Sequence, residues 1–247
     1  QIQKSIETQI LKKQARDVDV LNVIEAVRSF GISPKIYQAS TSELFSGDPS
    51  QAPQNENTPF SPKSPYGAAK LYGFEIARIY RERYGMFIVN GILFNHESER
   101  RGGNFVTRKV TLEIREILEG KREKIVLGNL EARRDWGYAP EYMEATWRML
   151  QQDTPEDYII ATGETHSVEE FAREACRIAG LDFEKVVSVS EKFKRPNEVN
   201  YLCGDASKAK KKLKWSPKVT FKELVHIMVR HDLKGVKNIP SYDRSKK

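Results

Sequence analysis

Glycine is missing from the first 30 residues of the chain, and the earliest one is Gly31. A Gly-rich turn between a strand and a helix brings backbone amides and a helix N-terminus to the pyrophosphate of a dinucleotide. The sequence therefore has no such turn at its beginning, and no other segment replaces it.

Cysteine is also scarce, with only Cys176 and Cys203 among 247 residues. Two cysteines make no disulfide framework and indicate a reducing compartment, so we expect a cytoplasmic protein. The four histidines and two cysteines show no metal-ligand spacing, so no metal is expected. No apolar run approaches the ~20 residues of a membrane span. Residues 1–16 are polar and basic, unlike a signal peptide.

The net charge of +7 calls for an anionic partner. The lysine-rich stretch 208–214 could indicate nucleic-acid binding, but no binding motif accompanies it. It also fits a short helix with Asp205 as N-cap and with Ala209 and Leu213 on one face. We therefore favour a solvated helix face and a phosphorylated small molecule as partner, and expect no nucleic acid.

Hydrophobic periodicity predicts a strand–helix–strand unit in the first part of the chain. Apolar residues at helical spacing predict a helix over 17–30, which Gly31 ends. A short strand at 35–39 and a polar surface loop at 46–64 follow. Pro65 then opens a long helix to about Tyr84, and the apolar run 86–94 is typical of a buried parallel strand.

The remaining segments also alternate between helix and strand. Helices are expected at 105–119 and 140–151, and strands at 125–127 and 158–161. Two capping-box pairs, Ser167 with Glu170 and Thr220 with Glu223, predict the starts of two further helices. The expected fold class is α/β, a Rossmann-type doubly wound parallel sheet. Residues 1–94 would form its remaining part and residues 95–247 mainly a smaller substrate-binding domain, with strand 158–161 returning to the sheet.

A candidate catalytic set lies at the end of the first predicted strand and on the helix after it. Ligands bind at the carboxyl ends of strands in open α/β sheets, which is where residues 40–43 fall. Tyr66 and Lys70, four apart, share one helix face. A phenol is a poor base near neutral pH, but a nearby ammonium favours the phenolate. Taken alone, this pair is better explained as a surface tyrosine beside a solvated lysine.

In its context the pair resembles the extended short-chain dehydrogenase/reductase superfamily, and within it the GDP-mannose 4,6-dehydratase family. The resemblance covers about Asp17 to Leu233. The similar segments are residues 37–44, 64–72, 90–98, 105–109, 127–130, 134–137, 160–163 and 195–196.

The resemblance implies catalytic roles for Thr41, Glu43, Tyr66 and Lys70. Thr41 would bind the hexose 4-hydroxyl, and Tyr66, assisted by Lys70, would remove its proton as hydride passes to NADP. Glu43 would abstract the C5 proton and protonate the departing 6-hydroxyl. The product would be GDP-4-keto-6-deoxy-mannose, the first intermediate toward GDP-fucose and other GDP-deoxyhexoses.

The resemblance also implies the binding residues and partners. Tyr66, Lys70, His96 and Arg101 would contact NADP, and the loop that carries Arg101 indicates self-association as a dimer or tetramer. GDP-mannose is the implied substrate. Its binding residues would be Asn95, Lys109, Asn129, Arg134, Arg195 and Glu198. Neither nucleic acid nor a membrane is an expected partner.

The pattern departs from the family at its beginning, since the Gly-rich segment is absent and residues 1–16 do not resemble the family. Three explanations stay open: a fragment of a longer protein, a degenerate product, or a pseudoenzyme subunit that associates with full-length family members. Another candidate is a 4,6-dehydratase or epimerase acting on a different nucleotide sugar. The Thr41-Ser42-Glu43 string argues against dTDP-glucose, whose dehydratases resemble Thr-Asp-Glu there.

Overall fold

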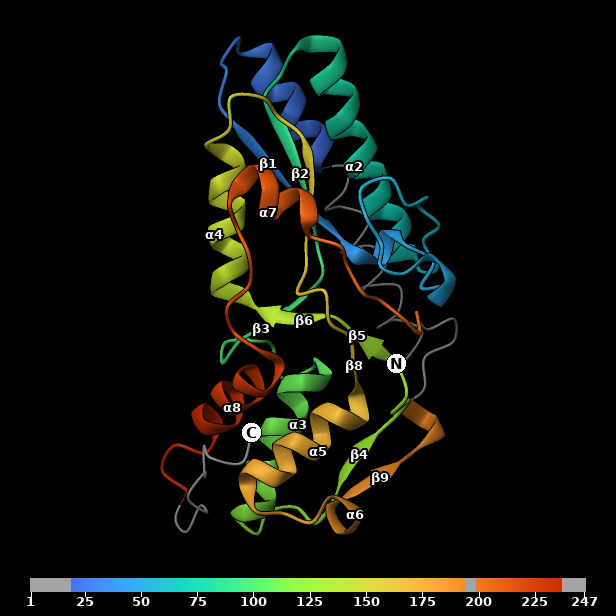
Figure 1. The fold of residues 1–247 in the computed structure, drawn as a ribbon, viewed down its shortest axis with the longest axis vertical. Helices are drawn as coiled ribbons and strands as arrows, with labels where there is room; N and C mark the ends of the chain where they lie inside the picture. The colour runs from blue at the N-terminus through green and yellow to red at the C-terminus, as the bar shows by residue number, and fades with distance from the viewer. Residues whose placement is uncertain (1–18, 194–198, 237–247) are drawn as a thin grey trace.

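The computed structural model describes residues 19–193 and 199–236. Two lobes lie one above the other along the molecule (Figure 1). The upper lobe contains a parallel sheet with helices on its faces, and the lower lobe is mostly helical. The α/β fold class predicted from the sequence is confirmed.

The sheet of the upper lobe has the strand order β1-β2-β7, and its pairs are parallel. The strands are β1 (Ile36–Thr41), β2 (Ile88–Leu93) and β7 (Asp157–Ile160). All of β2 is buried, as its apolar run predicts. Parallel pairing brings the carboxyl ends of the strands to one edge, where Thr41 is the register partner of Leu93 and Leu93 that of Ile160.

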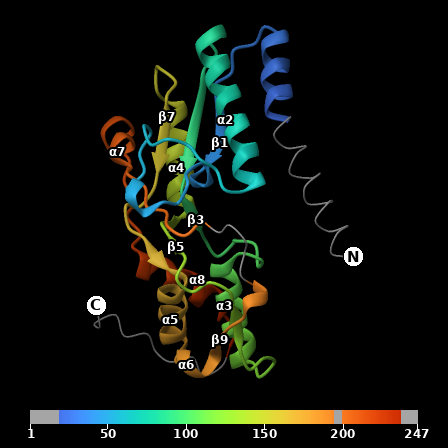
Figure 2. The ribbon, with the colours of Figure 1, turned by 90° about the vertical axis from the view of Figure 1, so that its right-hand side faces the viewer.

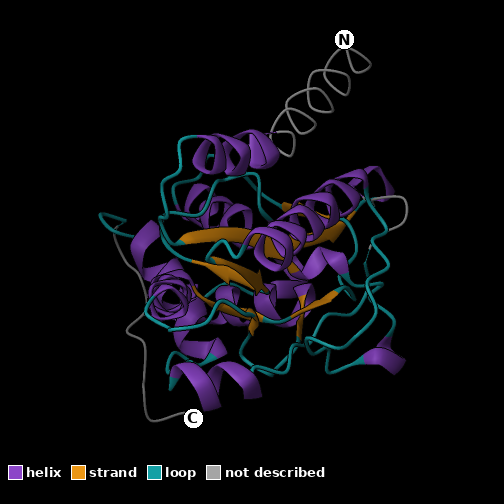
Figure 3. Cartoon of the chain, turned by 90° about the horizontal axis from the view of Figure 1, so that it is seen from above, coloured by secondary structure: helices purple, strands orange, loops and turns teal. Residues whose placement is uncertain are grey.

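Helices cover both faces of this sheet. They are residues 19–29, α2 (Pro65–Tyr84), α4 (Ala139–Leu150) and α7 (Ser207–Leu213). The first two lie on one side of the strands and the last two on the other (Figure 2). Side chains of β2 pack on both faces of the sheet. Ile88 packs with the first pair of helices, and Val89 and Leu93 pack with the second pair. Seen from above, the strands lie between helices (Figure 3).

The longest described helix, α2, has the boundaries that the sequence predicts. At its start, the Ser64 hydroxyl accepts a hydrogen bond from the Gly67 N–H, and Pro65 occupies the first turn. At its end, Gly85 has a φ of +64°, a left-handed conformation that favours glycine. The β1-α2-β2 segment is thus the predicted strand–helix–strand unit.

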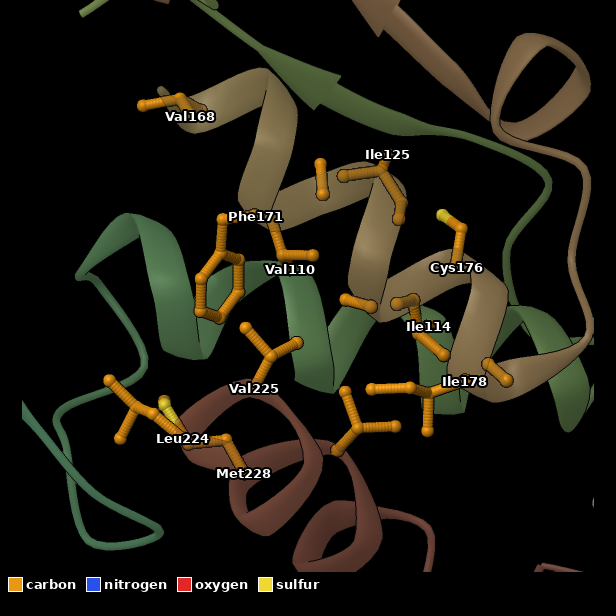
Figure 4. Close-up of a cluster of buried hydrophobic side chains, with 14 of the residues drawn as sticks. Val110, Ile114, Ile125, Val168, Phe171, Cys176, Ile178, Leu224, Val225 and Met228 are labelled. Carbon is orange, nitrogen blue, oxygen red and sulfur yellow. The ribbon is translucent and has the colours of Figure 1, made fainter. Parts of the chain in front are cut away.

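The lower lobe surrounds a core formed mainly by three helices. Figure 4 shows Val110 and Ile114, Phe171, and Val225 and Met228 converging from these helices. The elements of the lobe are α3 (Val106–Leu118), β4 (Ile125–Leu127), α5 (Val168–Ala179), α6 (Phe183–Val186), β9 (Val187–Val189) and α8 (Phe221–Asp232).

Two short strand pairs lie between the lobes (Figure 1). The first is the parallel pair of β3 (Asn95–Glu97) and β6 (Trp136–Tyr138), and the second is the antiparallel pair of β5 (Arg133–Arg134) and β8 (His166–Ser167). Because β3 follows β2 after one residue, the junction connects directly to the carboxyl end of the sheet.

Three local predictions need correction. Strand β1 extends past the predicted 35–39 to Thr41, because the ladder with β2 continues to that residue. Asp205 is not the N-cap of α7. The cap is Ala206, and the Asp205 carboxylate instead accepts from the Ser207 N–H. At α5, Ser167 caps the helix, but the Glu170 carboxylate contacts His166 and Arg133 rather than completing a capping box.

The segment 46–64 is more than a surface loop, because Gln54 within it is fully buried and forms a bridge with Gly204. In the lysine-rich helix α7, Lys208 and Lys212 both pair with Glu156, which accounts for part of its charge. Over residues 19–193 and 199–236, no helix is both long and apolar enough to span a bilayer. The same residues contain no cluster of His, Cys, Asp and Glu suited to a metal ion.

Candidate active site

The candidate site begins where β1 ends and the chain makes a tight turn. The Glu43 N–H donates to the Thr41 Oγ1 at 3.2 Å, and residues Ser42–Leu44 form a single 3-10 turn. Ser42 and Leu44 point into the protein, whereas Thr41 and Glu43 are only half-buried. The hydroxyl and the carboxylate therefore stay accessible at the carboxyl end of the sheet.

Gly67 lets the first turn of α2 pack directly against this 3-10 turn. A Cβ at Gly67 would lie 2.5 Å from the Glu43 carbonyl oxygen and 2.9 Å from the Pro62 Cβ. Tyr66 is the preceding residue, so its backbone lies beside the turn that carries Thr41 and Glu43. The close approach of the two backbones, which only glycine permits, holds the start of α2 against the turn that carries Thr41 and Glu43.

Replacing Gly67 by alanine should push α2 away from the Glu43 carbonyl. We expect the free energy of unfolding to fall by about 1–3 kcal/mol, the usual cost of overpacking. Gly73→Ala is the matched control on the same helix, since its Cβ would meet the amide end of the Gln38 side chain, which can shift. Urea denaturation compares the two variants. Equal stability of both would contradict the close packing at Gly67.

Lys70 connects the helix to β1. Its ammonium donates to the Ala39 carbonyl oxygen at 3.1 Å and lies 5.9 Å from the centre of the Tyr66 ring. The positive charge is thus held between the strand end and the phenol. Such an arrangement can stabilise a phenolate and bind a ligand hydroxyl.

His96, on β3, is held by two contacts. Its Nδ1 lies 2.8 Å from the Phe94 carbonyl oxygen, and its ring stacks on the Tyr142 ring with centroids 5.2 Å apart. Burial lowers the pKa of the imidazole, and the Arg101 charge lowers it further. The neutral form is therefore favoured at neutral pH.

Arg101 lies inward in this structure. Its Nε is 3.2 Å from a Glu97 carboxylate oxygen, and its guanidinium lies 3.6 Å from the centre of the Phe105 ring. Glu97 is buried and also accepts a 2.5 Å hydrogen bond from the Thr107 hydroxyl. Burial raises the pKa of Glu97, and Arg101 and Thr107 oppose that rise. The sequence analysis did not select Glu97, although it adjoins His96.

The predicted substrate-binding residues are distributed over the junction and the lower lobe. Asn95 on β3 is the register partner of Trp136, and the Arg134 guanidinium donates to the Arg133 carbonyl oxygen at 2.9 Å. The Lys109 ammonium donates to the Val126 carbonyl oxygen at 2.5 Å, and Asn129 accepts from the Glu131 N–H at 3.0 Å. The other two predicted residues, Arg195 and Glu198, lie outside the described residues.

Asp135 is a second residue that the sequence analysis did not select. It is fully buried between β5 and β6 and accepts four hydrogen bonds, from the Thr162 N–H and hydroxyl and from the Gly163 and Gly204 N–H groups. The Arg-Asp-Trp-Gly string around it was the only available signal.

A cavity of about 380 Å³ lies beyond β7, and it contains none of the predicted site residues. Its lining includes Thr162, Lys210 and Trp215. The predicted catalytic residues lie instead near the carboxyl end of β1, on the turn after it and on the first turns of α2.

Most of the chain is similar to one family in sequence. The family model described as GDP-mannose 4,6 dehydratase matches residues 1–228. It therefore includes residues 1–16, which the sequence analysis had placed outside the resemblance, and that boundary was wrong. The GDP-mannose 4,6 dehydratase of Homo sapiens is 48% identical over 94% of this chain, and that of Drosophila melanogaster is 48% identical over 90%.

The chain is shorter than these relatives. It spans 68% of the human protein and 61% of the Drosophila protein.

The fold is shared with more distant solved structures. RMD from Pseudomonas aeruginosa complexed with NADPH has a TM-score of 0.80 at 17% identity, covering 88% of this chain and 72% of that one. The dTDP-glucose 4,6-dehydratase of Bacillus anthracis in complex with NAD has a TM-score of 0.76 at 21% identity, covering 87% and 67%. The chain shares the fold of these structures and belongs to the GDP-mannose 4,6 dehydratase family.

Proposed function

We propose that this chain carries the catalytic residues of an NADP-dependent GDP-mannose 4,6-dehydratase, a hydro-lyase that converts GDP-mannose to GDP-4-keto-6-deoxy-mannose. The observation that carries the proposal is the packing of the Thr41–Glu43 turn against the helix that carries Tyr66 and Lys70. In this arrangement Glu43, Tyr66 and Thr41 would act on the same sugar ring, bound at the edge of the sheet.

In the first step, the Thr41 hydroxyl binds the 4-hydroxyl of the sugar, and Tyr66 takes its proton. The ammonium of Lys70 stabilises the phenolate that this requires. Loss of a hydride from C4, for which NADP would be the acceptor, completes the oxidation to a C4 ketone, and this ketone acidifies the proton on C5.

In the second step, Glu43 removes the C5 proton and transfers a proton to the 6-hydroxyl, which leaves as water. Its carboxylate makes no side-chain hydrogen bond within the described residues, so both oxygens can take part in proton transfer. C5 is then reprotonated, and the proton that Tyr66 took from the 4-hydroxyl balances the one that C5 regains. Relative to GDP-mannose, the product has lost one water.

NADP is the proposed cofactor, and part of its site is recognisable here. When bound, it would supply hydride chemistry, as acceptor from C4 and donor to C6. Tyr66, Lys70 and His96 lie at the carboxyl end of the sheet, where such a ligand binds in open α/β folds. Arg101, which pairs with Glu97 in this structure, is the proposed fourth contact. Gly31 is the only glycine among the described residues before β1, so these residues offer no Gly-rich turn for a pyrophosphate.

Recognition of the GDP moiety would fall to Asn95, Lys109, Asn129 and Arg134, with Arg195 and Glu198. Arginine and lysine suit a diphosphate, because arginine in particular binds oxyanions with two parallel donors. We also propose self-association as a dimer or tetramer, supported by the apolar side chains that α2 exposes at Tyr72 and Ile79. A cytoplasmic location is also proposed, and it is supported by the free thiols of Cys176 and Cys203.

Mass spectrometry of GDP-mannose incubated with the purified chain and NADP tests the function. The expected product is lighter than GDP-mannose by one water. Tyr66→Phe should lower its rate of formation by about 10²–10⁴-fold, because the general base is lost. Absence of product from the folded wild-type chain would favour a non-catalytic subunit. Product from dTDP-glucose or a UDP-sugar alone would overturn the substrate assignment.

A further inference from the structure

The His96 ring has a hydrogen-bond partner, the Phe94 carbonyl oxygen, that can accept a hydrogen bond but cannot donate one. The imidazole Nδ1 lies 2.8 Å from the Phe94 carbonyl oxygen, so Nδ1 must carry the proton of this hydrogen bond. Because burial favours the neutral ring, the tautomer is defined: Nδ1 donates, and Nε2 has a free lone pair. Nε2 makes no hydrogen bond within the described residues, and it is the nitrogen left for a ligand.

The hydrogen bond to the Phe94 carbonyl does not by itself fix the plane of the His96 ring. A second contact, with the Tyr142 ring, fixes that plane. The Tyr142 ring lies against the imidazole at a centroid distance of 5.2 Å and an interplanar angle of 27°. Tyr142 comes from α4, which begins directly after β6, the strand that pairs with β3. The Trp215 ring meets the Tyr142 ring edge-on at 5.7 Å and 88°.

The structure makes unusual room for this tyrosine ring. Tyr142 is fully buried, and a Cβ at Gly137 would lie 2.2 Å from its ring. Its hydroxyl is buried without a hydrogen-bond partner, which costs stability relative to phenylalanine. The hydroxyl therefore gains nothing from its surroundings, while the ring is enclosed on every side.

We propose that Tyr142 is a positioning residue, whose ring stack together with the Phe94 carbonyl fixes His96 in the Nδ1–H tautomer with Nε2 directed to a ligand N–H or O–H. The assignment of that ligand to the cofactor rests on the proposed function. The tautomer and its dependence on Tyr142 do not.

Nitrogen-15 NMR of the His96 ring in the whole chain, without any added ligand, tests the proposal. In the wild-type protein we expect the Nδ1–H tautomer and a pKa below the ordinary 6.5. An Nε2–H tautomer in the wild-type spectrum would by itself overturn the proposal.

Two substitutions separate the ring from the hydroxyl. Tyr142→Phe keeps the ring, and its His96 tautomer and pKa should match those of the wild type. Tyr142→Leu removes the ring, and should give a mixture of tautomers and a pKa closer to 6.5. If Tyr142→Leu does not fold, Tyr142→Met takes its place, because methionine fills irregular gaps without a flat ring. An unchanged tautomer and pKa in the folded variant would show that Tyr142 is only a core residue.

In a catalytically active preparation, Tyr142→Leu should raise KM for NADP about tenfold with a smaller change in kcat, the size of effect seen when a ligating imidazole loses its orienting partner. Failure of the proposed function removes only this second readout. The NMR result stands on the protein alone.

Discussion

Replacing Glu43 by glutamine is expected to lower the turnover of GDP-mannose by about 10²–10⁴-fold, the usual contribution of a general acid–base group. Glutamine keeps the shape of the side chain but cannot take the C5 proton. The Glu43 backbone, which holds the turn through the bond from its N–H to Thr41, is unchanged. The kcat for loss of water, followed by mass spectrometry, measures the effect.

Substrate binding and folding should change little in Glu43→Gln, because its carboxylate makes no side-chain hydrogen bond within the described residues. We expect the Kd for GDP-mannose, from calorimetry, to stay within a few-fold of the wild-type value. Glu82→Gln, an exposed glutamate at the far end of α2, is the control and should retain full activity. A Glu43→Gln enzyme with near wild-type kcat would move the C5 chemistry to another residue.

Local signals in the sequence predicted most of the helices and buried strands. The boundaries of α2 followed from Ser64, Pro65 and Gly85, each of which acts through its own backbone neighbours. The helix at Phe221–Asp232 followed from the capping box of Thr220 and Glu223, which the structure contains in full. The strand at 158–161 was also expected in the sheet, and β7 pairs with β2 there.

Contacts between distant segments could not be predicted in this way. The pairing of β5 with β8 involves two residues on each strand, too few for any periodicity. The position of Arg101 depends on three residues that come together: Glu97 from strand β3, Phe105 at the N-cap of α3, and Thr107 within α3. The proximity of Tyr66 to Glu43 depends on Gly67, whose function in packing appears only once both backbones are placed.

The same limitation hid the role of Asp135, and here the expected effect on stability is the largest. Its carboxylate joins three segments: the residue between β5 and β6, the loop after β7 at Thr162 and Gly163, and the later segment at Gly204. The hydrogen bonds are 2.7 to 3.2 Å long, and the residue is fully buried. Arg134 is the preceding residue, so the hydrogen bonds of Asp135 also help to determine where this predicted substrate-binding residue lies.

Asp135→Ala should lower the free energy of unfolding by about 3–5 kcal/mol, because it leaves buried donors without an acceptor. Asp135→Asn should also destabilise, since its amide NH₂ would face N–H donors on one side. Asp153→Ala, at an exposed position, is the control. Urea denaturation of all three gives the ranking. If Asp135→Ala were as stable as Asp153→Ala, water would have to satisfy the donors of Thr162, Gly163 and Gly204, and the junction between the lobes would not depend on this carboxylate.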